Sequence, residues 1–280
     1  MIETSFNAFA HSPDPMPLER EFKIAVSAGS IQVRQYSPEK NPVGLPCYLY
    51  FHGGGFWLGT LDQTDANCRA MAKDANCVVV SVDYRLAPEH KFPTAAEDCY
   101  AALIWVSEHA GELGIDPSRI AVGGGSAGGN LAAVVALMAR ERGGPHLVFQ
   151  VLEIPVTDFT RLDALQVPSE GLTVPSGKEQ YRSYYLSTDA DASNPHASPL
   201  LAADHAGLPP ALVMCAEYDP LRPEGEAYAD SLRKAGVSVE YHCWEGQFHG
   251  SQGMAKLIPA EAKAYHDMLV GALRRIWDDG

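Results

Sequence analysis

Ser126 lies in a Gly-Gly-Ser-Ala-Gly run that spans residues 124–128, a G-x-S-x-G pentapeptide. The preceding run 119–123 is rich in β-prone residues, and the following run 130–136 is typical of a helix. A sharp strand-to-helix turn holds such a serine in a strained conformation with its hydroxyl exposed, and flanking glycines avoid collisions with the neighbouring strand and helix. Because serine is a weak nucleophile without favourable geometry and a base, the pattern predicts a nucleophile at Ser126.

A serine nucleophile needs a histidine base, and the chain has ten histidines. His249 lies in a loop expected after the last strand and before the final helix, where the order Ser…Asp/Glu…His puts the base. His242 falls inside the last predicted strand, so we expect it to be packed or at the surface. The sequence therefore predicts His249 as the base.

The acid that orients the base is expected after the predicted strand 211–216. Asp219 is followed by a proline, which ends the strand and holds the carboxylate at the carboxyl edge of the sheet. Glu217 and Glu224 remain alternatives. Asp219 is the predicted third member, 30 residues before His249.

A glycine-rich run, His52-Gly53-Gly54-Gly55, directly follows the predicted strand 47–51. Consecutive glycines expose backbone N–H groups and allow a ligand to approach them closely. Together with the N–H of Ala127, such a run can bind the oxyanion of an acyl-transfer intermediate. The alternative is an ordinary glycine turn after a strand.

Strand-like and helix-like segments alternate along the chain, which predicts an α/β fold whose parallel sheet is covered on both faces. Thr94 is expected to cap its helix. The predicted strands are 21–26, 30–36, 47–51, 77–82, 120–122, 147–154, 211–216 and 237–241, and the predicted helices are 62–75, 94–110, 127–142, 223–235 and 255–277.

The stretch 159–199 breaks this alternation. It contains several prolines, an aromatic helical segment at 180–186 and no clear strand. We expect it to be an insertion between two core strands that lies over the site.

Composition argues against some classes of binding partner and indicates a cellular compartment. The formal net charge of −14 over 280 residues argues against nucleic acid and against anionic membrane surfaces. Six cysteines without a C-x-x-C pair or His/Cys cluster predict neither a disulfide scaffold nor a metal site, so a reducing compartment is expected. The N-terminus lacks a signal-peptide pattern, and no apolar run approaches the ~20 residues of a membrane span. We therefore expect a cytoplasmic protein.

Taken together, these motifs make the chain resemble the bacterial hormone-sensitive-lipase-like (HGGG, acetyl esterase) family of α/β-hydrolases. The resemblance covers nearly everything from about residue 45 onward. It rests on the runs His52–Phe56, Ser81–Pro93, Gly124–Asn130, Asp219–Arg222 and Phe248–Gly250.

The resemblance implies an α/β-hydrolase fold, with a mostly parallel eight-stranded sheet flanked by helices and a small helical cap. Residues 1–280 would form a single domain, with the cap made from about 1–20 and 159–199. The implied activity is that of a carboxylesterase on short- to medium-chain acyl esters, without metal or cofactor. Gly54 and Gly55 would supply oxyanion donors beside Ala127.

Three departures from the family pattern stand out. Gly125 occupies the place of the usual aspartate before the nucleophile, Pro223 stands where many relatives carry another acid, and the segment before His52 is shorter than usual. The short segment predicts a more open acyl pocket. Its polar rim would be lined by Lys178, Tyr181 and Arg182.

Other functions share this scaffold. Plant gibberellin receptors resemble the family but have lost the catalytic histidine, so a small-molecule receptor is one alternative. An amidase or lactonase with the same three residues is another. The partner is expected to be a small-molecule ester, and the protein a monomer or a homodimer.

Overall fold

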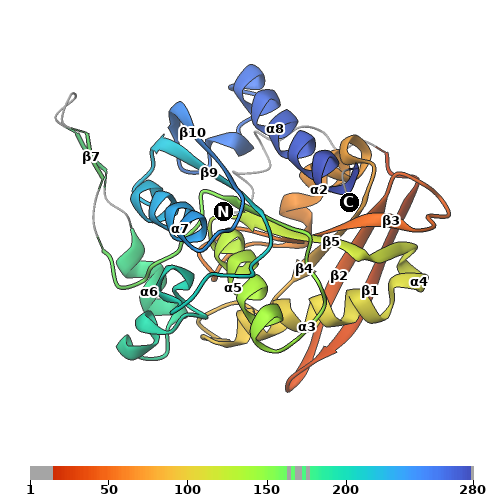
Figure 1. The fold of residues 1–280 in the computed structure, drawn as a ribbon, viewed down its shortest axis with the longest axis horizontal. Coiled ribbons are helices and arrows are strands. Elements are labelled where there is room, and N and C mark those ends of the chain that lie inside the picture. The colour runs from red at the N-terminus through yellow and green to blue at the C-terminus, as the bar shows by residue number, and fades with distance from the viewer. Residues whose placement is uncertain (1–14, 163–164, 168–171, 175–176, 279–280) are drawn as a thin grey trace.

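The structure is a computed structural model that describes residues 15–162, 165–167, 172–174 and 177–278 (Figure 1). Within these residues, eight strands form one sheet in the order β1-β2-β4-β3-β5-β6-β9-β10. β1 pairs antiparallel with β2 and β2 with β4, and the remaining neighbours are parallel, as predicted. The strands are β1 (Leu18–Val26), β2 (Gly29–Ser37), β3 (Leu45–Phe51), β4 (Val78–Asp83), β5 (Ile115–Gly125), β6 (Phe149–Glu153), β9 (Ala211–Tyr218) and β10 (Val239–Phe248).

Helices cover both faces of this sheet (Figure 1). One face packs against α3 (Thr94–Glu108), α5 (Ala127–Glu141) and α7 (Arg222–Lys234), and the other against α2 (Leu61–Ala75) and α8 (Pro259–Asp278). The central strands are mostly apolar because both of their faces are buried. Two short helices complete the set: α4 (Ala110–Leu113), which follows α3 and adds Leu113 to the same core, and α6 (Lys178–Tyr185).

The parallel strands bring distant parts of the chain to one edge of the sheet. β3, β5, β6, β9 and β10 run in the same direction, so their carboxyl ends meet there. The segments that follow these ends contain the glycine run after His52, Ser126, Asp219 and His249. In open α/β sheets this edge is where ligands bind.

Two local predictions were wrong. Thr94 does not cap α3: Pro93 holds the N-cap position without a side-chain bond, and the Thr94 N–H already bonds to Lys91 O at 3.0 Å. The last helix starts at Pro259 instead of residue 255, because proline has no N–H to donate and is tolerated in the first turn of a helix.

The segment 159–199 contains strands that the sequence did not predict. β7 (Leu165–Val167) pairs antiparallel with β8 (Leu172–Val174), and this hairpin extends away from the main sheet (Figure 1). Runs of three residues are too short for an alternating pattern to be recognised. α6 and the 3₁₀ helices Asp189–Ser193 and Pro199–Leu201 complete the segment.

The predicted cap stays a prediction. Its residues 1–14 lie outside the described part of the chain, and residues 18–20 belong to β1 of the main sheet. Among the described residues, no helix combines the length and the apolar character needed to cross a bilayer.

Candidate active site

Ser126 forms the turn between β5 and α5. Its backbone has φ 57° and ψ −113°, a conformation that residues with a Cβ rarely adopt. Hydrogen bonds hold it on both sides: its N–H donates to Glu153 O at 2.7 Å, and its carbonyl oxygen accepts from Asn130 N at 3.0 Å. The strained turn is thus fixed by β6 and by the first turn of α5.

Two of the glycines around Ser126 are required by close packing. A Cβ on Gly124 or on Gly128 would collide with the carbonyl oxygen of Phe51 on β3. This confirms the steric reason given for the flanking glycines. Gly125 is different, because the nearest atom to a Cβ built there is Glu153 Cβ at 4.0 Å.

The structure brings Ser126, His249 and Asp219 together. His249 Nε2 lies 2.9 Å from Ser126 Oγ, and His249 Nδ1 lies 2.8 Å from Asp219 Oδ2. A carboxylate only accepts hydrogen bonds, so Nδ1 carries the proton and Nε2 can accept the proton of the serine hydroxyl. This arrangement can generate a serine nucleophile.

Asp219 is held rigidly for this contact. It follows β9 directly, its side chain is 1% exposed, and its Oδ1 accepts a hydrogen bond from Leu221 N at 2.8 Å. The alternative acids have other partners: Glu217 accepts from Gly246 N at 2.7 Å, and Glu224 accepts from Thr157 N at 2.9 Å.

His242, the other histidine near the end of the sheet, has a packing role. His242 lies within β10, and its ring contacts the Trp244 ring at 4.3 Å between centroids. His249 lies just beyond the end of the same strand, in a loop.

The glycine run after β3 lies against the nucleophile turn. A Cβ on Gly53 would be 2.9 Å from Gly125 O and 3.7 Å from Ser126 Cβ. Gly54 has φ +122°, and its carbonyl oxygen accepts from Leu58 N at 2.9 Å. Glycine conformations therefore allow this backbone to approach Ser126.

His52, the residue before the three glycines, is held by packing and a hydrogen bond. Its ring stacks on Tyr84 at 4.2 Å between centroids, and Tyr84 Oη donates to His52 O at 2.7 Å. Burial lowers the pKa of His52 to about 4, so the imidazole is neutral at physiological pH. His52 thus acts as a packed, uncharged support.

The predicted oxyanion donors are Gly54, Gly55 and Ala127. Ala127 is the first residue of α5, and the first N–H groups of a helix have no partner within it. The helix dipole adds positive potential at that end. These features suit an anion, and the assignment of the three donors stays a prediction.

The residues predicted for the pocket rim all lie on α6 but differ in environment. Tyr181 lies beside the glycine run, since a Cβ on Gly55 would be 3.3 Å from Tyr181 Cβ. Its buried hydroxyl has no hydrogen-bond partner in the described part of the chain. Arg182 pairs with Asp189 at 2.9 Å.

Lys178 does not lie on an open rim as predicted. It is 2% exposed, pairs with Glu224 and donates to Asp158 O at 2.9 Å. A charge this deep inside needs such partners, which the sequence pattern could not reveal.

Sequence reasoning missed Glu153, the last residue of β6. It is 4% exposed, and burial raises its pKa to about 7 against the opposing effect of the Tyr265 hydroxyl. The available signal was a carboxyl group at the end of an apolar run expected to be a buried strand.

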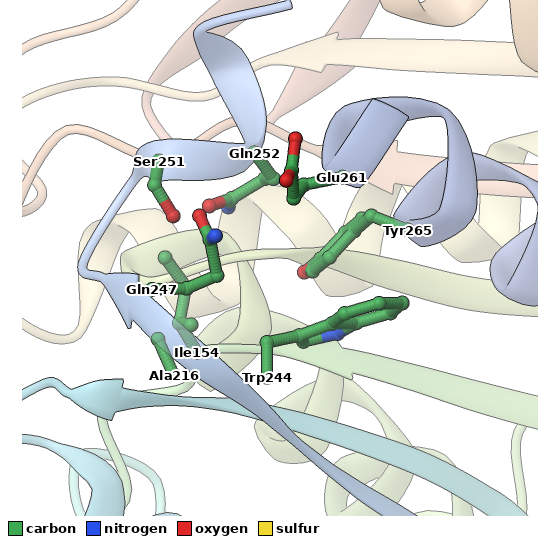
Figure 2. A pocket seen from close by; sticks show the side chains of 8 residues that line it. All are labelled: Ile154, Ala216, Trp244, Gln247, Ser251, Gln252, Glu261 and Tyr265. Atoms are coloured by element: carbon green, nitrogen blue, oxygen red, sulfur yellow. The ribbon is translucent and has the colours of Figure 1, made fainter. Parts of the chain in front are cut away.

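A small cavity, lined in part by Ile154, the residue after Glu153, lies on the α8 face of the sheet (Figure 2). Tyr265 of α8 and Trp244 of β10 form one side, and Gln247 and Ser251, which flank His249 in sequence, form another (Figure 2). The space for water in it is about 10 Å³, which suffices for about one molecule. The remaining lining residues are Ala216, Gln252 and Glu261.

Metal ligation finds no support in the described residues. No group of three or more His, Cys, Asp or Glu side chains there is arranged to hold an ion.

Comparison with known proteins agrees with this fold. A family model described as the alpha/beta hydrolase fold matches residues 48–253. The chain is 43% identical over 266 residues to the carboxylic ester hydrolase LipN of Mycobacterium tuberculosis, covering 91% of this chain and 69% of LipN. It is 46% identical over 244 residues to the carboxylesterase NlhH of the same species, covering 84% of this chain and 75% of NlhH.

Solved structures show the same similarity. EstE1, a thermophilic carboxylesterase cloned from a metagenomic library, superposes with a TM-score of 0.88 and 42% sequence identity. The match covers 98% of this chain and 94% of EstE1.

Proposed function

The chain belongs to the hormone-sensitive-lipase-like family of α/β-hydrolases and is a carboxylic ester hydrolase, and from this premise we propose that it cleaves short- to medium-chain acyl esters with Ser126, His249 and Asp219. The observation that carries the proposal is the position of the His249 ring, 2.9 Å from Ser126 Oγ and 2.8 Å from Asp219 Oδ2. The substrate is a small-molecule ester.

In the proposed mechanism, Ser126 Oγ attacks the ester carbonyl carbon while His249 Nε2 accepts the hydroxyl proton. Asp219 holds the imidazole in the required tautomer and stabilises the imidazolium. The N–H groups of Gly54, Gly55 and Ala127 bind the oxyanion, and losing one such donor typically costs about 10²–10³ in rate.

Collapse of the tetrahedral intermediate breaks the bond to the leaving alkoxide, which takes the proton from His249. The acyl group then remains on Ser126, and water releases it by the same steps with His249 again as base.

The experiment that tests the proposal compares Ser126→Ala with Ser118→Ala on p-nitrophenyl acetate, butyrate and octanoate. Ser118 is an exposed serine near the opposite end of β5, so it serves as the matched control. We expect Ser126→Ala to lose about 10⁶-fold in kcat and Ser118→Ala to retain wild-type turnover.

An active-site label gives a second readout. A diethyl phosphoryl adduct seen by intact mass on the wild type, and absent from Ser126→Ala, supports the nucleophile. Undiminished turnover by folded Ser126→Ala would contradict it. An anilide and a lactone in the same panel distinguish an esterase from an amidase or lactonase.

A further inference from the structure

Glu153 is joined to the nucleophile by the backbone. It is paired with Gly125 in the register of β5 and β6, and its carbonyl oxygen accepts the Ser126 N–H at 2.7 Å. Three residues further on, Val156 N donates to Ser126 O at 3.4 Å. The position of Ser126 therefore depends on the turn that starts at Glu153.

That turn is strained. Ile154 has φ +42°, which is an outlier for a β-branched residue, and its N–H donates to Met214 O on β9 at 2.6 Å. Such a conformation persists only where the surroundings impose it. The buried side chain of Glu153, one residue earlier, is part of those surroundings.

The environment of the Glu153 carboxyl suits a neutral group. Its ionisable neighbours are tyrosines, Tyr48 and Tyr50 from β3 and Tyr265 from α8, while Gly125 on β5 and Met214 on β9 add no charge. The Tyr265 hydroxyl favours the ionised form of Glu153 by hydrogen bonding, but burial has the larger effect on the pKa of this carboxyl. Among the described residues, Glu153 Oε1 and the Tyr48 hydroxyl have no other hydrogen-bond partner. A buried carboxylate without a cationic partner is costly, so the proton stays on.

We propose, on the basis of the proposed esterase function, that Glu153 is a positioning residue of Ser126 and that its carboxyl holds the strained turn in the protonated, neutral form. Ionisation would draw the carboxylate towards water, and the cavity of Figure 2, which shares Tyr265 and Ile154 with this region, offers the space. The turn and the Ser126 backbone would then lose their support.

Glu153→Gln tests the proposal because glutamine has the shape of the neutral acid and cannot ionise. The ratio of its kcat to that of the wild type should rise between pH 6 and pH 9, by up to about 100-fold if the neutral form alone is active. KM should change little, because the substrate contacts remain. Glu261→Gln, the exposed carboxyl lining the same cavity, is the matched control and should show the wild-type pH profile.

A second measurement does not depend on turnover. Carbon-13 NMR of the wild type, labelled at glutamate side chains, should show one carboxyl that titrates near neutral pH and is missing from Glu153→Gln. A Glu153 that titrates with ordinary carboxyls, or a Glu153→Gln profile identical to the wild type, would overturn the proposal. Failure of the esterase mechanism is distinguishable, because it would appear as turnover that survives Ser126→Ala.

Discussion

Replacing Lys178 with methionine removes the positive member of a buried ion pair while keeping most of the side chain's volume. Lys178 lies at the start of α6 and Glu224 in the first turn of α7, and their side chains are 2% and 4% exposed. Loss of one partner from a buried pair costs about 3–5 kcal/mol, because the other charge stays buried. Glu224 keeps its hydrogen bond from Thr157 N at 2.9 Å, so we expect the lower end, about 3 kcal/mol.

This loss should depend on pH. Burial raises the pKa of Glu224 above its ordinary value of 4.5, while Lys178 opposes that rise. Without Lys178 the folded-state pKa is higher still, so the variant is most stable below pH 4.5, where the carboxyl is neutral in both states. Its stability then falls as pH rises through the folded-state pKa. The deficit against the wild type should therefore be larger at pH 8 than at pH 5.

The measurement is urea unfolding at both pH values, with the free energy extrapolated to water. Arg182→Met is the matched control on the same helix, because its partner Asp189 is 99% exposed, and it should leave the free energy unchanged within error. Adding Glu224→Gln to Lys178→Met removes the stranded charge, keeps an acceptor for Thr157 and should recover about 2 kcal/mol. A deficit below about 1 kcal/mol at pH 8, or one independent of pH, would refute the reasoning.

Three further substitutions test the acid and the glycines of the active site. Asp219→Asn should lower kcat about 10⁴-fold, because the amide no longer holds the proton on His249 Nδ1. Steady-state kinetics on p-nitrophenyl butyrate measures this loss, and a loss below tenfold would argue against Asp219. Gly124→Ala should lower the free energy of unfolding by about 3 kcal/mol, since its methyl group meets Phe51 O. The methyl group of Gly125→Ala has 4.0 Å to its nearest neighbour, so this variant should be tolerated. Thermal unfolding compares the two variants, and equal losses of stability would contradict the steric account.

Local patterns were sufficient for the strands of the main sheet and for the helices that cover it, but not for β7 and β8. Short apolar runs in the sequence indicate buried parallel strands. The glycines beside Ser126 indicate a tight turn, because only a residue without a Cβ fits there. The boundaries were less well predicted. Thr94 and the start of α8 were misplaced because a proline and its turn, not propensity, decide where those helices begin.

The sequence by itself determined the class of fold, the nucleophile turn and the set of possible acids, because each depends on residues adjacent in the chain. Which acid meets His249, why Lys178 is buried and where Glu153 lies were decided by the tertiary structure. Asp219, Glu217 and Glu224 fall within eight residues of one another, and strand ends and helix turns send their side chains in different directions. The physical reason is that a carboxylate's role follows from its partners and its access to water, and both are supplied by segments far away in the sequence.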